Sequence, residues 1–413
     1  MDLISFLNDS VTPFHTVENI AREFSQNGFE ELFETDVWNL RRGASYFVKR
    51  GAALFAFRMP DVWNAESRFR LASAHTDFPA LKISPNPDKI SAGIHLLHPE
   101  VYGGALENTW FDRDLGIAGL VMTLDSGKLK KNLVKMKSLC RIPELAIHLN
   151  RGVKENGFSF NSQNHLNVCF SASGKTFGQV LEEEVGSRVV DFELQFFDAQ
   201  PAAFGGFSKE WIYSGRLDNL LSCHALVEGL RKAAESSLHL CGAFFFDDEE
   251  IGSETRSGAA GSFAFAMLER IVECENGSRG ELWGKLSDSF LFSLDVAHAT
   301  HPAYEEKMEP NHAPVLGKGV VLKVNAKKRY ASEAVSNALF KCLCEKAEIP
   351  MQTFVCRNDM PCGSTVGPHL SASLGIPTVD LGEAILSMHS IREMAAVENH
   401  GEICSLMKSF YQS

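Results

Sequence analysis

Apolar blocks separated by short polar stretches run through most of the chain, and their lengths alternate between those of strands and helices. Strands are predicted at 69–74, 239–246, 289–294, 351–356 and 376–381, with two more in 45–59 around Arg50 and Gly51. Helices are predicted at 2–8, 16–26, 219–234, 257–272, 332–347 and 393–411, the last broken near Gly401. This alternation predicts an α/β fold with a mostly parallel sheet flanked by helices.

A different pattern follows the strand at 69–74. Pro79, Pro85 and Pro87 interrupt the chain there, and short strand-like runs and a Gly103-Gly104 turn continue to about residue 213. We therefore predict an inserted β-rich domain at 86–213. The main domain is then formed by residues 1–85 and 214–413.

Composition narrows the class of protein. The chain has 413 residues, 45% of them hydrophobic, which is enough for a large core and for more than one domain. Its net charge of −12 argues against nucleic-acid binding. Neither a membrane span nor a signal peptide is predicted. The 10 scattered cysteines are typical of reduced thiols in a cytosolic protein.

Polar residues follow three of the predicted strands. The run Asp247-Asp248-Glu249-Glu250 comes directly after the apolar segment 241–246, His75 and Asp77 follow 69–74, and Asp295 follows 289–294. Adjacent carboxylates repel one another and resist burial, so a nearby positive charge is expected. Because ligands of open α/β sheets bind beyond the carboxyl ends of the strands, these residues predict one shared metal centre.

Each candidate also has a plainer interpretation. His75 and Asp77 point to the same side of an extended backbone, so Asp77 could orient a metal-bound His75, but a hydrogen-bonded histidine at a strand end is also possible. Glu249 and Glu250 could divide the roles of base and ligand, or belong to a solvated acidic loop.

The remaining candidates are weaker when each is taken alone. Asp218 begins a predicted helix, where an aspartate is common for electrostatic reasons. His389 precedes the last helix and could be structural. Together, however, two histidines, a bridging carboxylate and further carboxylates would bind two zinc ions with a shared water.

The chain resembles the aspartyl aminopeptidase family (metallopeptidase family 18), in the form of its bacterial members. The matching segments occur in order over almost the whole chain: Ser73-Ala74-His75-Thr76-Asp77, 109–115, Arg216-Leu217-Asp218-Asn219, 248–253, 295–302, Asn311-His312, 323–332, 362–365 and Met388-His389-Ser390.

The resemblance implies a zinc-dependent exopeptidase with a defined set of site residues. The metal ligands would be His75, Glu250, Asp295 and His389, with Asp218 bridging two zinc ions, one of them exchangeable for Mn²⁺ or Co²⁺. Glu249 would be the general base and Asp77 the residue that orients His75. His148, within the matching segment 141–148, would stabilise the oxyanion in a neighbouring subunit, in a tetrahedral dodecamer built from dimers through the inserted domain.

The family also suggests a substrate class. Peptides would lose their N-terminal residue, with a possible preference for Asp or Glu, and Lys323, Arg329 and Tyr330 are the candidates for the pocket. These residues could equally form a solvated basic turn, because Lys327 and Lys328 lie between them. The loop 362–368 lacks the lysine and spacing of a phosphate-binding loop.

Two other functions stay open on the sequence alone. A related two-metal hydrolase, such as an N-acyl amino-acid deacylase or a carboxypeptidase, would use a similar ligand set. A non-enzymatic scaffold is the other alternative.

Overall fold

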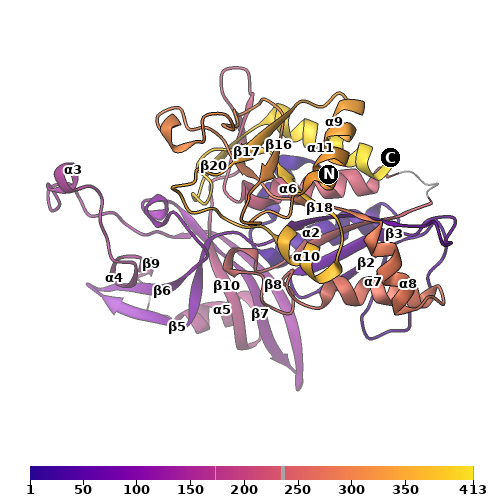
Figure 1. Ribbon diagram of the computed structural model, residues 1–413. Coiled ribbons are helices and arrows are strands. Elements are labelled where there is room, and N and C mark those ends of the chain that lie inside the picture. Colours follow the sequence, from indigo (N-terminus) through magenta and orange to yellow (C-terminus); the bar gives the residue numbers. More distant parts are fainter. Residues whose placement is uncertain (173, 234–237, 413) are drawn as a thin grey trace.

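The computed structural model describes residues 1–172, 174–233 and 238–412, and its backbone forms two large sheets that lie side by side (Figure 1). The larger sheet has nine strands in the order β1-β2-β3-β13-β4-β14-β18-β16-β17. Its central strands β13, β4, β14 and β18 are parallel, whereas the pairs β2–β3, β3–β13 and β16–β18 are antiparallel. The bounds are β1 Glu30–Leu32, β2 Ser45–Arg50, β3 Ala53–Arg58, β4 Phe69–His75, β13 Leu240–Phe246, β14 Phe290–Leu294, β16 Val320–Val324, β17 Met351–Val355 and β18 Thr378–Gly382.

Helices cover both faces of this sheet, which explains why its central strands are apolar throughout. Every residue of β13 is buried, and the side chains of Phe244 and Phe245 point into different cores. One core contains residues of α1 (Leu3–Asp9), α2 (Pro13–Gln26), α6 (Leu217–Arg231), α9 (Ala334–Lys346) and α11 (Val397–Gln412). The other contains residues of α7 (Phe263–Cys274), α8 (Arg279–Ser287) and α10 (Val366–Leu374). The predicted α/β class is confirmed.

The second sheet is antiparallel and is inserted between β4 and α6. Its order is β8-β7-β10-β5-β6-β9, and it packs on its own apolar core with α5 (Phe177–Val185). The strands are β5 Ala80–Ser91, β6 Ile94–Tyr102, β7 Leu115–Asp125, β8 Lys128–Cys140, β9 Val168–Ser171 and β10 Arg188–Asp198. Between β8 and β9, the short helix α3 (Val153–Asn156) lies in a segment that extends away from the sheets, and α4 (Ser162–His165) lies beside β9 (Figure 1).

Two smaller sheets and three short turns complete the described part of the fold. A three-stranded sheet pairs β11 (Ala203–Gly205) with β12 (Trp211–Ser214) and β12 with β20 (Glu393–Ala396). A two-stranded parallel sheet pairs β15 (Ala297–His298) with β19 (Ala384–Ile385). Short 3₁₀ turns occur at η1 (Glu107–Trp110), η2 (Glu249–Ile251) and η3 (Glu305–Lys307).

Two predicted helices were wrong in part. The segment 257–262 is not helical, and α7 starts at Phe263. The segment 393–396 is the strand β20, and α11 begins only at Val397 and continues without a break through Gly401. The helix tolerates this glycine because buried side chains such as Ile403 and Met407 pack it against the core. The predicted end of the helix at 219–234 falls on Ala234, which lies outside the described residues.

In the described ranges, no helix combines the length and the apolar character that are needed to cross a bilayer.

Candidate metal centre

Three of the candidate residues meet because their strands are neighbours in the sheet. His75 is the last residue of β4, Glu249 and Glu250 form the turn η2 just after β13, and Asp295 follows β14. Strand β4 pairs with β13 on one side and with β14 on the other, and all three are parallel. Their carboxyl ends therefore lie together at one edge, as the sequence predicted.

The other two candidates reach the same edge from different elements. Asp218 lies in the first turn of α6, where its backbone is not yet helical (φ −80°, ψ 106°). His389 lies between β19 and β20 and adopts a left-handed backbone conformation with φ 67°, which is uncommon for a residue with a side chain. Their chain positions are far apart, so only the folded structure brings their side chains together.

The side chains form two groups that share Asp218. His75 Nε2 lies 3.5 Å from Asp218 Oδ1 and 4.0 Å from Asp295 Oδ1. His389 Nε2 lies 3.4 Å from Asp218 Oδ2 and 3.5 Å from Glu250 Oε1. The two sets His75–Asp218–Asp295 and Asp218–Glu250–His389 each offer three ligand atoms within 4.8 Å of one another.

The side chains of these residues are placed better for binding two zinc ions than for hydrogen-bonding to one another. The separations exceed those of normal N–H···O hydrogen bonds, which are about 2.7–3.2 Å, and suit ligands that surround a common ion. Asp218 Oδ1 is buried and has no hydrogen-bond partner within the described part of the chain. A buried acceptor without a donor is costly, and a cation would satisfy it. Imidazole and carboxylate ligands without thiolates are typical of catalytic zinc sites.

Asp77 holds the turn that carries both glutamates. Its carboxylate accepts the backbone N–H groups of Glu249 and Glu250, each at 3.1 Å. The ring of His75 contacts the same residue, because Nδ1 is 3.0 Å from the main-chain carbonyl oxygen of Asp77 and 3.4 Å from its carboxylate. Either contact leaves Nε2 of His75 facing Asp218 and available to a metal.

Sequence reasoning missed three groups that support the site. The Tyr102 hydroxyl, from β6 of the inserted sheet, donates to Asp77 at 2.7 Å. The carbonyl oxygen of Gly104 lies 3.0 Å from His389 Nδ1. The buried carboxylate of Glu393 accepts the backbone N–H of His389 at 2.8 Å and that of Asp218 at 3.1 Å. Tyr102 and Gly104 come from the inserted part of the chain, and Glu393 reaches Asp218 from β20, so no signal in the sequence pointed to these contacts.

The predicted substrate residues line the same cavity, and His148 does not. Lys323, Arg329 and Tyr330 border a cavity of about 340 Å³ together with the candidate ligands. Lys323 is buried; its Nζ donates to the carbonyl oxygen of Val296 at 3.0 Å and lies 3.6 Å from Asp295. His148 is exposed, in a turn of the segment that leads to α3.

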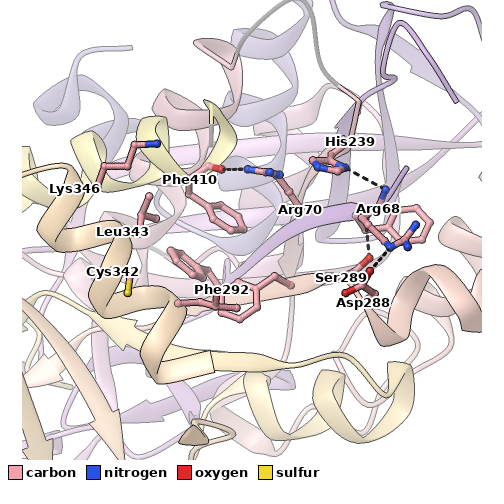
Figure 2. Close-up of a pocket in the computed structure, with 13 residues that line it drawn as sticks. Arg68, Arg70, His239, Asp288, Ser289, Phe292, Cys342, Leu343, Lys346 and Phe410 are labelled. Atoms are coloured by element: carbon pink, nitrogen blue, oxygen red, sulfur yellow. Dashed lines mark hydrogen bonds and ion pairs between the residues drawn. The ribbon is translucent and has the colours of Figure 1, made fainter. Parts of the chain in front are cut away.

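A second cavity of similar size lies at the opposite edge of the nine-stranded sheet, where β4 and β14 begin (Figure 2). Its wall is mainly apolar, with Phe292 and Phe410 on one side. Among the described residues that line it, the acidic side chain is that of Asp288, which is paired with Arg68 at 2.8 Å. The cavity's described lining residues offer no group of carboxylates and histidines like the one at the carboxyl edge.

Comparison with known proteins identifies the family. The family model "Aminopeptidase I zinc metalloprotease (M18)" matches residues 6–411. The chain belongs to the M18 family of zinc metalloproteases. It is 40% identical to a probable M18 family aminopeptidase 2 of Pseudomonas aeruginosa over 427 residues, which covers 100% of this chain and 97% of the relative. The corresponding protein of Streptomyces avermitilis is 39% identical over 421 residues, with the same coverage.

Solved structures agree with this assignment. The structure described as the Ape4 and Nbr1 complex has a TM-score of 0.94 and 36% identity, covering 100% of this chain and 85% of that chain. The S. cerevisiae mApe1 dodecamer has a TM-score of 0.86 and 27% identity, covering 99% and 95%. The M18 aminopeptidase of Thermotoga maritima, at 24% identity, has the same fold with a TM-score of 0.87 and coverage of 99% and 94%. The predicted family and the aminopeptidase class are confirmed.

Crowding of buried carboxylates dominates the electrostatics of this M18 site. Burial, reinforced by the charges of Asp295, Asp77 and Asp218, raises the pKa of Glu249 to about 8. Burial likewise raises the pKa of Asp295 to about 6, although the nearby Lys323 ammonium opposes this shift. Without metal, the folded site therefore binds protons that the same residues would release in the unfolded chain.

This difference predicts how the metal-free protein responds to pH. Glu249 titrates near 4.5 when unfolded and near 8 when folded, so the folded state binds more protons between these values. The stability of the chelated protein should therefore fall as the pH rises from about 5 to about 8. Denaturant unfolding of the chelated protein should show this slope, and Glu249→Gln should flatten it in part. The exposed neighbour Glu254 provides the control, and an equal flattening by Glu254→Gln would contradict the assignment.

Proposed function

We propose that this M18 protein is a two-zinc aminopeptidase that hydrolyses the N-terminal residue of peptides. The observation that carries the proposal is the pair of ligand sets joined by Asp218. One carboxylate with an oxygen near each histidine is the arrangement that a bridging ligand needs. His75 and Asp295 would complete one zinc position, and His389 and Glu250 the other, with Mn²⁺ or Co²⁺ as possible substitutes at one of them.

The residues of the chain divide the chemistry among them. Two bound zinc ions would acidify a shared water and polarise the scissile carbonyl group. Glu249 lines the cavity and lies near His75 and Glu250, but it belongs to neither of the two sets that share Asp218; in this proposal it accepts the proton of the attacking water. It then passes this proton to the leaving amine. Asp77 keeps Glu249 in place through the backbone hydrogen bond to its N–H group.

The cavity also supports a preference for acidic N-terminal residues. Arg329 is exposed and lines the cavity, while its Nε donates to the carbonyl oxygens of Cys362 and Gly363, each at 3.2 Å. These contacts hold the guanidinium group in the cavity wall, where it can attract a substrate carboxylate. Lys323 lies deeper, and its positive charge stabilises the carboxylate of Asp295 as well as making the pocket more positive.

The position of His148 supports a role in a neighbouring subunit. The residue lies in a projecting segment whose apolar side chains are poorly covered: Leu145 is 52%, Ile147 48% and Leu149 76% exposed. Exposed apolar side chains on one segment are typical of a protein interface. An assembly such as the dodecamer of the related mApe1 would cover them and could bring His148 to another subunit's cavity. We propose a dodecamer with tetrahedral symmetry.

The cysteines support a cytosolic location. All ten are free thiols, and several of them, including Cys223 and Cys344, are buried in the apolar core. Reduced, buried cysteines are typical of proteins in a reducing compartment.

Replacing the proposed base gives the most direct test of the function. Glu249→Gln should lower kcat at least about 100-fold, because the amide cannot accept the proton of the water. Elemental analysis should still find the zinc content of the wild type. Glu254→Gln, a change of the same size in an exposed residue four positions beyond Glu250, should leave kcat unchanged. Normal turnover by Glu249→Gln would exclude this mechanism.

Substrate preference tests the pocket separately. Aspartyl and glutamyl substrates should be cleaved about tenfold or more faster than leucyl substrates, as judged by kcat/KM. Arg329→Gln should reduce this ratio by slowing the acidic substrates only, whereas Lys327→Gln on the same turn should not change it. Faster cleavage of leucyl substrates by the wild type would refute the acidic preference but not the peptidase activity.

Mixed assemblies test the transfer of His148 between subunits. His148→Ala and Glu249→Gln assemblies should each be nearly inactive. Co-expression of both chains should restore about a quarter of the wild-type activity, because random pairing then combines an intact base with an intact partner histidine in about one site of four. Failure of the mixed assembly to gain activity would show that His148 does not act across the interface.

A further inference from the structure

A cluster of metal-ligating side chains lies outside the catalytic cavity, where α6 packs against α11. His400 and Cys404 are four residues apart on α11, so they lie on the same face of that helix, and His224 faces them from α6. His400 Nε2 lies 2.9 Å from His224 Nδ1 and 3.6 Å from the Cys404 sulfur. All three ligand atoms lie within 4.8 Å of one another.

The outer nitrogen of each ring is bound to an oxygen acceptor. His224 Nε2 lies 3.1 Å from the main-chain carbonyl oxygen of Met1, which can only accept a hydrogen bond. His400 Nδ1 lies 2.9 Å from Glu383 Oε1, and this carboxylate is also an acceptor. Each ring therefore carries its hydrogen on the outer nitrogen, and the inner nitrogens of neutral rings would both present lone pairs.

Two lone pairs 2.9 Å apart repel one another, so the cluster needs a positive charge between the rings. A shared proton satisfies the two nitrogens but makes no use of the sulfur. A metal ion would satisfy all three donors at once.

We propose that His224, His400 and Cys404 form a zinc site that is separate from the catalytic centre. Two imidazoles and a thiolate are zinc ligands, and the fourth position is left for water. Zinc–ligand bonds of about 2.0–2.1 Å to nitrogen and 2.3 Å to sulfur place nitrogen and sulfur about 3.6 Å apart in a tetrahedral site. The observed nitrogen–sulfur distance already has this value. The two nitrogens would have to separate by about 0.4 Å as the ion replaces the proton.

The surroundings of the cluster support a metal site in two further ways. Glu383 binds the outer nitrogen of His400, which is the usual arrangement behind a zinc-bound histidine. Cys404 is only partly buried, so an ion can reach the cluster from solvent. The ion would connect α6, which carries Asp218 at its start, with α11 and the end of β18. The ion would therefore cross-link α6 and α11 without contacting the substrate.

Cobalt substitution distinguishes this site from the catalytic one, because the proposed catalytic ligands contain no sulfur. Titration of the chelated, reduced enzyme with Co²⁺ should produce a thiolate-to-cobalt charge-transfer band in the near ultraviolet. Cys404→Ser should abolish this band and lower the zinc content of the zinc-loaded enzyme by about one ion per subunit. Cys342→Ser, which removes an exposed thiol of α9, should change neither quantity.

Two results would overturn the site. One is the lack of a charge-transfer band in the wild type at saturating Co²⁺, which would leave the shared proton as the only cation of the cluster. The other is a band that persists unchanged in Cys404→Ser or in a second variant, His224→Gln. The charge-transfer band and the zinc content do not depend on activity, so a failure of the catalytic proposal would not alter the outcome of this test. Cys404→Ser should retain its aminopeptidase activity.

Discussion

Repulsion among buried carboxylates is the constraint that shapes the carboxyl edge of the main sheet, where the proposed metal centre lies. Five carboxylates lie close together there, those of Asp77, Asp218, Glu249, Glu250 and Asp295. Burial removes most of the water that would screen their charges. The chain itself offers only partial compensation through Lys323 and the two histidines. Divalent cations would supply the missing positive charge, so metal binding and the stability of this edge would be linked.

The apolar sheet makes this arrangement possible. Strand β13 is buried along its whole length, and the ring of Phe244 stacks on that of Phe55 with centroids 3.9 Å apart. Close packing of this kind gives the strand ends fixed positions, because small shifts would open cavities or create clashes. The ligands at the ends of β4, β13 and β14 are thus placed by the core behind them rather than by their own interactions.

The sequence was sufficient for the parts of the site that end a strand. His75, Glu249 and Asp295 each follow an apolar run, and parallel strand ends meet at one edge, so local pattern and a general rule predict their meeting. The sequence pattern could not predict the strand β20. Residues 393–396 join directly to a helix, and they form a strand only because they pair with β12. Glu393 therefore escaped notice, although its carboxylate binds the backbone of both Asp218 and His389.

The contacts between the two sheets explain why an inserted domain can matter for catalysis. The chain leaves the main sheet just after His75 and returns just before Asp218, so both ends of the insert carry site residues. In between, Tyr102 binds Asp77 and the carbonyl of Gly104 binds His389. Gly103 lies so close to Glu250 that an added Cβ would be 3.0 Å from it, and its φ of 67° favours glycine. Any rearrangement of the inserted sheet, including one caused by assembly, would therefore be transmitted to residues proposed for both metal positions.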